Sequence, residues 1–174
     1  HDPRLIWNTF DVVEKYQGIP VQSKSGHSFI KDTMREHNAV YGGEMSAHHY
    51  FRDFSYCDSG MIPWLLVVSV LSETGKSLSS LVEEMITKFP CSGEINFKVA
   101  DTQITIQKLF DHFANQNPSI DHTDGVSLDF GAWRFNVRAS NTEPLLRLNI
   151  ETRLDQHPKP MQDYVDELTR LIQN

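Results

Sequence analysis

The chain has 174 residues with a hydrophobic content of 39%, which is enough for one globular domain or for two small ones with real cores. It carries 16 Lys and Arg against 23 Asp and Glu, and this net charge of −7 argues against a nucleic-acid or anionic-membrane surface, because those partners need a basic footprint. A few focused arginines could still bind a small anion.

The amino-terminal part alternates between short strand patterns and short helix patterns. "RLIW" has strand length, a helix is expected from about Phe10 to a stop at Gly18, and a strand follows at residues 19–22. A polar helix over about 28–37 and a short strand at 39–41 continue the alternation. Strands that alternate with helices favour a parallel sheet covered by helices.

The most apolar run, "MIPWLLVVSVL" at residues 61–71, predicts a buried helix. It is shorter than the roughly 20 residues that span a bilayer, and it contains Pro63. Asp58 is the expected N-cap of this helix and Gly75 its stop, and Ser77 then caps a second helix. The second helix has an apolar stripe with helical period, which we expect to be core. The stripe consists of Leu78, Leu81, Val82, Met85, Ile86 and Phe89.

Only two cysteines occur, Cys57 and Cys91, and they are isolated in the sequence. Two ordinary thiols in a reduced cytoplasmic protein are expected, with a disulfide as the alternative. No basic n-region, apolar h-region and cleavage site mark secretion. The chain also opens on "HDPRLIW" without an initiator methionine, so we expect a fragment of a longer protein.

The pattern changes after "FPCSGE", residues 89–94, which is the predicted linker. "EINFKV" is a strand, a helix follows with Ile106 and Phe113 on one face, and "WRFNVR" and "LLRLNIE" are alternating strands before a last helix. The predicted fold class is an α/β domain at residues 1–90, with a parallel or mixed sheet covered by helices. A small α+β domain with an antiparallel sheet is predicted at 91–174.

The stretch "RASNTEP", residues 138–144, follows the first strand of that hairpin. Alternation places Arg138 and Arg147 on the same solvent side of the two strands, where they flank a polar turn. The turn consists of Ser140, Asn141 and Thr142. Two guanidiniums with hydroxyl, amide and backbone N–H donors form a phosphate cradle. The alternative is an ordinary polar hairpin loop with two surface arginines.

A second constellation is "YGGEMSAHHYF", residues 41–51. Glu44, Ser46 and His48 alternate, so an extended segment would project them to one side, where they suit the hydroxyls of a sugar. Zinc held by His48, His49 and Glu44 competes with this interpretation. No i, i+4 histidine pair or CxxC supports zinc, and we predict no metal site. A polar loop at a strand end is the remaining alternative.

A weaker feature is "SKSGH", residues 23–27. Lys24 and His27 lie near the expected start of a helix, where anions are favoured. Most loops of this kind only cap a helix, so the pattern alone does not distinguish an anion site from a simple helix cap.

"GGEMSAHHYF" followed by "RASNTEP" resembles the carboxyl half of the α-D-phosphohexomutases, and the resemblance covers essentially all 174 residues. It is strongest to the bacterial phosphomannomutase branch that supplies GDP-mannose. The resemblance implies the third and fourth domains of a cytoplasmic, four-domain enzyme that interconverts mannose 6-phosphate and mannose 1-phosphate. A phosphoserine, Mg²⁺ and an activating bisphosphorylated sugar belong to that implied mechanism.

The resemblance also implies roles for single residues. Glu44 and Ser46 match sugar-hydroxyl contacts, His27 a further substrate contact, and His48 a group near the reacting atoms that assists proton transfer. Residues that match the loop around the non-reacting phosphate are Arg138, Ser140, Asn141 and Thr142, with Arg147 as companion. Ala47 stands where the wider family usually has glycine.

Two motifs of that family do not occur in this sequence: the Ser-His-Asn-Pro motif with the nucleophile and the Asp-Gly-Asp-x-Asp-Arg loop that holds Mg²⁺. A chain without nucleophile or metal site should not turn over, so we expect it to be inactive alone. Its expected partners are the phosphosugar and the N-terminal domains of the same chain. The alternatives are a non-catalytic phosphosugar-binding module and a phosphoglucomutase or dual-specificity mutase.

Overall fold

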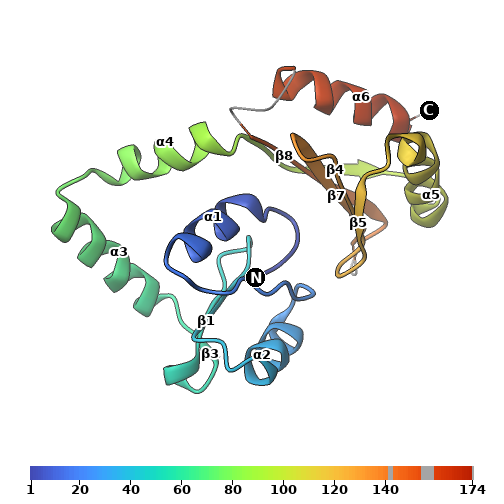
Figure 1. The fold of residues 1–174 in the computed structure, drawn as a ribbon. Helices are drawn as coiled ribbons and strands as arrows, with labels where there is room; N and C mark the ends of the chain where they lie inside the picture. The colour runs from blue at the N-terminus through green and yellow to red at the C-terminus, as the bar shows by residue number, and fades with distance from the viewer. Residues whose placement is uncertain (141–142, 154–158, 174) are drawn as a thin grey trace. The chain divides into compact units, whose positions relative to one another are not determined.

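The computed structural model describes residues 1–140, 143–153 and 159–173. The chain divides into two compact units, His1–Ile86 and Thr87–Asn174, and each is described by itself (Figure 1). Cys57 and Cys91 are both exposed and free, as expected for ordinary thiols.

The first unit combines helices with a small sheet. Its elements are α1 (Trp7–Lys15), α2 (His27–Glu36), β1 (Tyr41–Gly43), β2 (His49–Phe51), the 3₁₀ helix η1 (Arg52–Phe54), β3 (Cys57–Asp58), α3 (Met61–Thr74) and α4 (Leu78–Lys88), which continues past the unit boundary. The polar helix predicted at 28–37 is therefore present as α2. Ile30 and Met34 form the buried side of α2 and pack with the fully buried Tyr50 of β2.

The described sheet of this unit is antiparallel, in the order β1-β2-β3. Tyr41 pairs with Phe51, and Tyr50 pairs with Asp58. This differs from the parallel pairing that the alternation of strands and helices favoured, because β1 and β2 are joined by a short turn, and only antiparallel strands can be joined in this way. A parallel pattern does occur at one residue pair, where His1 N donates to Val21 O and Ser23 N donates to His1 O.

The two strands predicted at the amino end are not formed. Trp7 begins α1, and residues 19–22 adopt no regular structure. Ile6 and Trp7 are buried, at 7% and 3% exposure, as the entry to a helix. A short apolar run has no period of its own, so it fits a strand and the buried start of a helix equally well.

The apolar helix α3 is present but not buried. It begins after Gly60 instead of at the predicted cap Asp58, and it ends at Gly75, whose φ of 65° confirms the predicted stop. Trp64 and Leu65 are 57% and 56% exposed. Within the described residues no single helix is long and apolar enough to cross a membrane, and α3 and α4 pass that test only as a pair bent by 95°.

The apolar stripe of α4 is also not core, since Leu78, Val82 and Ile86 are 52%, 45% and 55% exposed. Ser77 does cap this helix, with its hydroxyl accepting from Ser80 N at 3.1 Å. A helical period indicates that a face is apolar, but it does not say which element covers it. The prediction of a core stripe is therefore wrong for the described part of the chain.

The second unit is a five-stranded antiparallel sheet with two helices. Its elements are β4 (Cys91–Lys98), α5 (Thr102–Phe113), the 3₁₀ helix η2 (Ala114–Gln116), β5 (Ser119–Asp121), β6 (Val126–Asp129), β7 (Trp133–Ala139), β8 (Leu145–Thr152) and α6 (Met161–Gln173). The strand order is β4-β8-β7-β6-β5. All four pairings are antiparallel, which confirms the predicted α+β domain with an antiparallel hairpin. The predicted linker at 89–94 overlaps β4, whose register shifts between Cys91 and Glu94.

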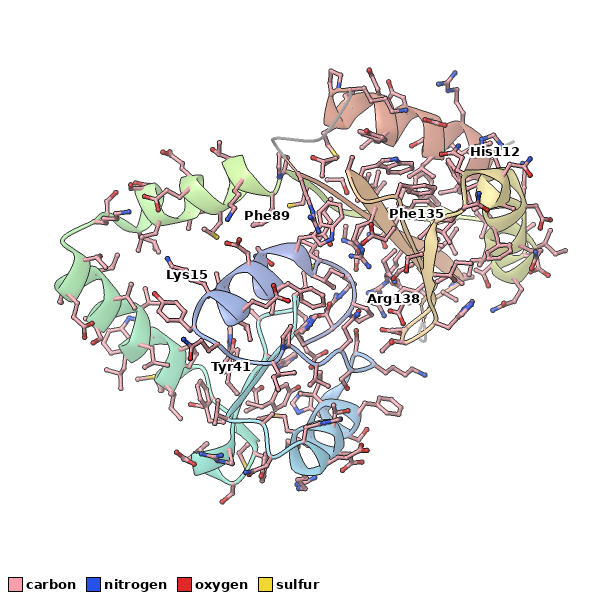
Figure 2. All side chains as sticks on the ribbon, viewed as in Figure 1. Lys15, Tyr41, Phe89, His112, Phe135 and Arg138 are labelled. Carbon is pink, nitrogen blue, oxygen red and sulfur yellow. The ribbon has the colours of Figure 1, made fainter. Side chains whose placement is uncertain are left out.

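The core of the second unit lies between the sheet and the helices α5 and α6. It contains the residues that the two alternating strands were predicted to turn inward: Trp133, Phe135, Val137, Leu146, Leu148 and Ile150. Figure 2 labels Phe135 and Arg138, which come from opposite faces of β7. Asp101 caps α5 by accepting from Gln103 N and Ile104 N.

The polar face of β7 and β8 was predicted to face solvent, but several of its side chains are buried. Arg134 is 1% exposed and Asn136 is 0% exposed. Arg134 lies opposite Glu151 and donates to it at 2.6 Å, while Asn136 lies opposite Asn149. Buried polar groups need partners, and the strand register supplies a charged partner for this arginine.

Candidate functional site

The turn between β1 and β2, residues 44–48, carries three of the predicted sugar-binding side chains. Glu44 N donates to His48 O at 3.0 Å, and Ala47 N donates to Glu44 O at 3.0 Å. Ala47 has a φ of 64°, in the left-handed region. The segment is therefore a tight turn, and the prediction of an extended segment that projects Glu44, Ser46 and His48 to one side is wrong.

Glu44 uses both carboxylate oxygens within the protein. Oε2 accepts from Gly26 N at 2.9 Å, and Oε1 accepts from the Tyr50 hydroxyl at 2.6 Å. Burial, followed by the hydrogen bond to Glu44, raises the pKa of Tyr50 above its ordinary value. Glu44 thus ties the start of α2 to β2, and Ser46 is exposed beside it in the turn.

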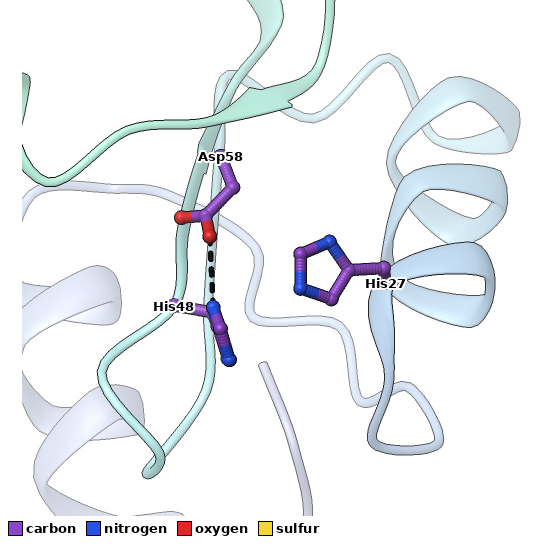
Figure 3. A group of neighbouring side chains, drawn as sticks. All are labelled: His27, His48 and Asp58. Carbon is purple, nitrogen blue, oxygen red and sulfur yellow. Dashed lines mark hydrogen bonds and ion pairs between the residues drawn. The ribbon is translucent and has the colours of Figure 1, made fainter.

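Three side chains from separate elements converge next to this turn, and we call them the histidine cluster: His27, His48 and Asp58 (Figure 3). His27 is the first residue of α2, His48 precedes β2, and Asp58 ends β3. The rings of His27 and His48 lie edge to face with centroids 4.7 Å apart. His48 Nδ1 lies 2.8 Å from Asp58 Oδ2.

Asp58 is a member of this cluster that sequence reasoning missed, since it was interpreted as a helix cap. Its other oxygen, Oδ1, accepts from His49 N at 2.9 Å. This backbone hydrogen bond, then the one with His48, holds the pKa of Asp58 below its ordinary value. The available signal was a hairpin pattern that brings residue 58 beside the strand that starts just after residue 48. It depends on a register that the sequence does not reveal.

The zinc ligands considered from the sequence are not assembled. His49 Nδ1 lies 2.7 Å from the Tyr41 hydroxyl, and Glu44 is engaged by Gly26 and Tyr50. A separate cavity of about 690 Å³ in the first unit has Glu44, Met34 and Val13 among its lining residues. The histidine cluster does not line it.

In the second unit, the β7–β8 hairpin brings the two predicted arginines together. Arg138 and Arg147 are directly opposite each other in the register. Ser140 N donates to Leu145 O at 2.8 Å, and Arg147 Nη2 donates to the Ser140 hydroxyl at 3.2 Å. The predicted site residues Asn141 and Thr142 lie outside the described residues.

Three carboxylates surround the two guanidiniums, and two of them, Glu94 and Asp124, come from outside the stretch at residues 138–144. Glu94 lies 3.7 Å from Arg138 Nη2 and 3.5 Å from Arg147 Nη1. Asp124 lies 3.9 Å from Arg138, and Glu143 lies 3.8 Å from Arg147. These separations are longer than a strong charge-assisted hydrogen bond of about 2.7–2.9 Å, so the carboxylates hold the guanidiniums loosely.

The Nε atoms of Arg138 and Arg147 are buried without a hydrogen-bond partner in the described part of the chain. Arg138 is 9% exposed as a whole. Two like charges placed opposite each other on one face of a sheet are unfavourable unless counter-charges compensate them. Glu94, Asp124 and Glu143 supply such counter-charges for Arg138 and Arg147.

Comparison with known proteins adds sequence-level evidence. The family described as "Phosphoglucomutase/phosphomannomutase, alpha/beta/alpha domain III" matches residues 1–89, and "Phosphoglucomutase/phosphomannomutase, C-terminal domain" matches residues 94–168. The chain belongs to the phosphoglucomutase/phosphomannomutase family. An α/β domain followed by a domain with an antiparallel sheet confirms the predicted fold class.

Individual relatives are similar over most of the chain. A protein named "Phosphomannomutase" from Vibrio cholerae is 57% identical over 173 residues, which cover 99% of this chain and 37% of that protein. "Phosphomannomutase" from Escherichia coli is 57% identical over 155 residues, covering 89% of this chain and 34% of that protein. A protein named "Phosphohexose mutases" from Xanthomonas campestris is 64% identical over 155 residues, which cover 89% of this chain and 35% of that protein. The chain thus spans about a third of the length of these curated relatives.

Solved structures share the fold. A phosphoglucomutase/phosphomannomutase family protein from Burkholderia thailandensis matches with a TM-score of 0.72 at 24% identity, covering 96% of this chain and 35% of that one. A putative phosphomannomutase from Thermus thermophilus matches with a TM-score of 0.68 at 17% identity, covering 99% of this chain and 36% of that one. At these identities the likeness concerns the fold alone.

Proposed function

We propose that this chain is the substrate-recognition part of a phosphomannomutase that interconverts mannose 6-phosphate and mannose 1-phosphate and supplies GDP-mannose synthesis in the cytoplasm. Residues 1–90 are the sugar-binding third domain of that enzyme, and residues 91–174 are its phosphate-binding fourth domain. Relatives named phosphomannomutase, at 57% identity, support the substrate.

The observation that carries the proposal is the pairing of Arg138 with Arg147 across the β7–β8 hairpin. Their guanidiniums converge, and the Ser140 hydroxyl lies at 3.2 Å from Arg147 Nη2. A phosphate accepts several hydrogen bonds at once, and arginine presents donors in a planar fork that matches its oxygens. In this role Asn141 and Thr142 complete the loop around the non-reacting phosphate.

The first unit supplies the contacts to the sugar. Glu44 and Ser46 bind hydroxyls, and each Glu44 oxygen keeps a lone pair beyond its hydrogen bond to Gly26 or Tyr50. His27 is a further substrate contact. His48 assists proton transfer near the reacting groups, with Asp58 holding its Nδ1 side so that Nε2 is available.

The chemical step belongs to parts of the enzyme that this sequence does not contain. The nucleophilic phosphoserine and the Mg²⁺ loop have no matching motif here, so this chain by itself does not turn over. Mg²⁺ supplies charge neutralisation at the transferred phosphoryl group when it is bound. The His27, His48 and Asp58 donor set does not fit Mg²⁺, because that ion prefers oxygen ligands.

A phosphoglucomutase or dual-specificity mutase is the second candidate. It is favoured by the relative named "Phosphohexose mutases", which is 64% identical over 155 residues. Mannose and glucose differ at a single hydroxyl, so both substrates use the same phosphate contacts. A non-catalytic phosphosugar-binding module would share these contacts as well.

The test is a calorimetric titration with mannose 1-phosphate, repeated with glucose 1-phosphate and with unphosphorylated mannose. We expect phosphate-dependent binding that is lost in Arg138→Ala and kept in Arg35→Ala, an exposed arginine paired with Asp32 at 3.0 Å. The same variants are assayed for turnover in the longer protein. Equal affinity for mannose 1-phosphate and mannose, or equal affinity in Arg138→Ala, would overturn the proposal.

A further inference from the structure

We propose that the histidine cluster, His27, His48 and Asp58, binds a divalent transition-metal ion, and that Zn²⁺ is the ion whose chemistry fits it best. One ligand atom from each residue lies within 4.8 Å of the other two (Figure 3). The proposal concerns a metal-bound state that does not depend on which phosphosugar the chain recognises, and Zn²⁺ there would compete with the substrate contact and proton transfer proposed for His27 and His48.

The donors are near enough to one another to share one ion after small side-chain shifts, since all three lie within 4.8 Å. Zn²⁺ binds histidine nitrogen and carboxylate oxygen at about 2.0–2.2 Å, which places tetrahedral ligand atoms roughly 3.3–3.5 Å apart. His48 Nδ1 and Asp58 Oδ2 are 2.8 Å apart, slightly closer than this, because a proton now lies between them. The metal takes the place of that proton, and the two side chains separate by a few tenths of an ångström.

Asp58 is held in position to act as a ligand. Its Oδ1 accepts from His49 N at 2.9 Å, which leaves Oδ2 directed at His48. A ligand fixed by a hydrogen bond from outside the metal site is typical of functional metal centres.

His27 is held by the start of α2, where Gly26 N donates to Glu44 Oε2 at 2.9 Å. Its ring packs edge to face on Tyr50, with centroids 5.2 Å apart, and Tyr50 is fully buried. Two of the three ligands therefore project from backbone that other hydrogen bonds and packing fix. The site is largely formed before a metal arrives.

The donor set selects the class of metal. Two imidazole nitrogens and one carboxylate suit Zn²⁺ and neighbouring transition metals, and they disfavour Mg²⁺ and Ca²⁺, which take oxygen ligands. The side chains of His48 and Asp58 are 42% and 29% exposed, so solvent can reach a fourth coordination position. Three protein ligands with an open position give weaker binding than a closed four-ligand structural site.

One factor opposes the metal. His27 lies at the amino end of α2, where the helix dipole favours anions over cations. The Asp58 carboxylate offsets this locally by supplying the negative charge of the site. Removing that charge should therefore weaken binding as strongly as removing an imidazole.

The experiment is titration of the 174-residue chain with Zn²⁺ by calorimetry and with Co²⁺ by visible absorption, since tetrahedral Co²⁺ has intense bands. We expect one equivalent to bind at this site, with tetrahedral Co²⁺ bands. Affinity for Zn²⁺ should fall by at least about tenfold in His27→Gln and in Asp58→Asn, in line with the loss seen when groups supporting a metal site are removed. Mg²⁺ should not compete.

Two control variants match these changes. His49→Gln replaces the neighbouring histidine, whose ring faces Tyr41, and Cys57→Ser removes the thiol next to Asp58. Both should keep the affinity of the unchanged chain. Circular dichroism checks that each variant folds, and Asn at position 58 keeps an acceptor for His49 N. Unchanged Zn²⁺ affinity in both His27→Gln and Asp58→Asn, or equal loss in His49→Gln, would overturn the proposal.

Discussion

Arg138 on β7 and Arg147 on β8 lie directly opposite each other, and Glu94 contacts both guanidiniums, at 3.7 and 3.5 Å. Like charges at paired positions of a sheet repel, so the hairpin depends on carboxylates or on a bound anion for compensation. This relationship links the strand register to the phosphate recognition that we propose.

Replacing Arg138 with Lys should weaken binding of mannose 1-phosphate by about tenfold or more, because an ammonium group is a point charge without the planar fork that binds two phosphate oxygens. Calorimetry of the chain measures the affinity. Arg35→Lys, at an exposed site in the first unit, is the matched control and should bind normally. Full affinity in Arg138→Lys would count against a bidentate contact.

Gly125 packs directly against the strand that carries Arg138. A Cβ at this position would lie 2.3 Å from Val137 O and 2.6 Å from Arg138 Cβ, and φ is 74°. Gly131 has a similar φ of 83° with nothing within 4 Å of its Cβ position. Gly131→Ala should therefore cost only the left-handed strain of about 1–2 kcal/mol.

Gly125→Ala should cost that strain plus about 1–3 kcal/mol for overpacking, and it should also displace Arg138 and lower phosphosugar affinity. Thermal unfolding and calorimetry of the two variants measure stability and binding separately. Equal effects of Gly125→Ala and Gly131→Ala on both quantities would show that the close approach to β7 has no consequence.

Ala47→Gly should stabilise the first unit by about 0.5–1 kcal/mol. Ala47 has a φ of 64°, and the left-handed strain that alanine bears there exceeds the extra backbone entropy that glycine loses on folding. Ala114→Gly is the matched control, since Ala114 is in the right-handed region with φ −53°. This substitution should destabilise the protein by about 1 kcal/mol. Denaturant unfolding measures both, and the same sign in both variants would contradict the argument.

Stability should fall as the pH rises above about 10, the ordinary pKa of tyrosine. Burial and the hydrogen bond to Glu44 raise the pKa of Tyr50, so the folded chain keeps a proton that the unfolded chain loses in this range. Tyr50→Phe should reduce this alkaline loss in unfolding experiments between pH 8 and pH 11. Part of the loss should remain, because burial also raises the pKa of Tyr164 in the second unit.

Elements whose pattern and boundaries are local could be predicted from the sequence. The helix α2, the stop at Gly75 and the β7–β8 hairpin all agree with expectation, because each depends on residues close in the chain. Alternation along two adjacent strands was sufficient to bring Arg138 and Arg147 together. The burial of Arg134 was not predictable, since it needs the register that places Glu151 opposite it.

Groups contributed by distant segments were missed. Glu94 and Asp124 reach the arginines from β4 and from the approach to β6, and Asp58 reaches His48 from β3. None of these pairs has a signature in the spacing of residues along the chain. The 44–48 turn was misjudged because Ala47 adopts a conformation that alanine rarely shows, so the extended interpretation was the ordinary one.

The double engagement of Glu44 has a thermodynamic consequence. Its two oxygens join Gly26, at the start of α2, to Tyr50 of β2. In the proposed sugar-binding role, a ligand hydroxyl that displaced Gly26 N from Glu44 Oε2 would also shift His27, the next residue along the chain. One coupling free energy would then link ligand binding at Glu44 to ligand binding at His27. Because such coupling is reciprocal, a group bound at His27 would change the affinity for a ligand at Glu44 by the same factor.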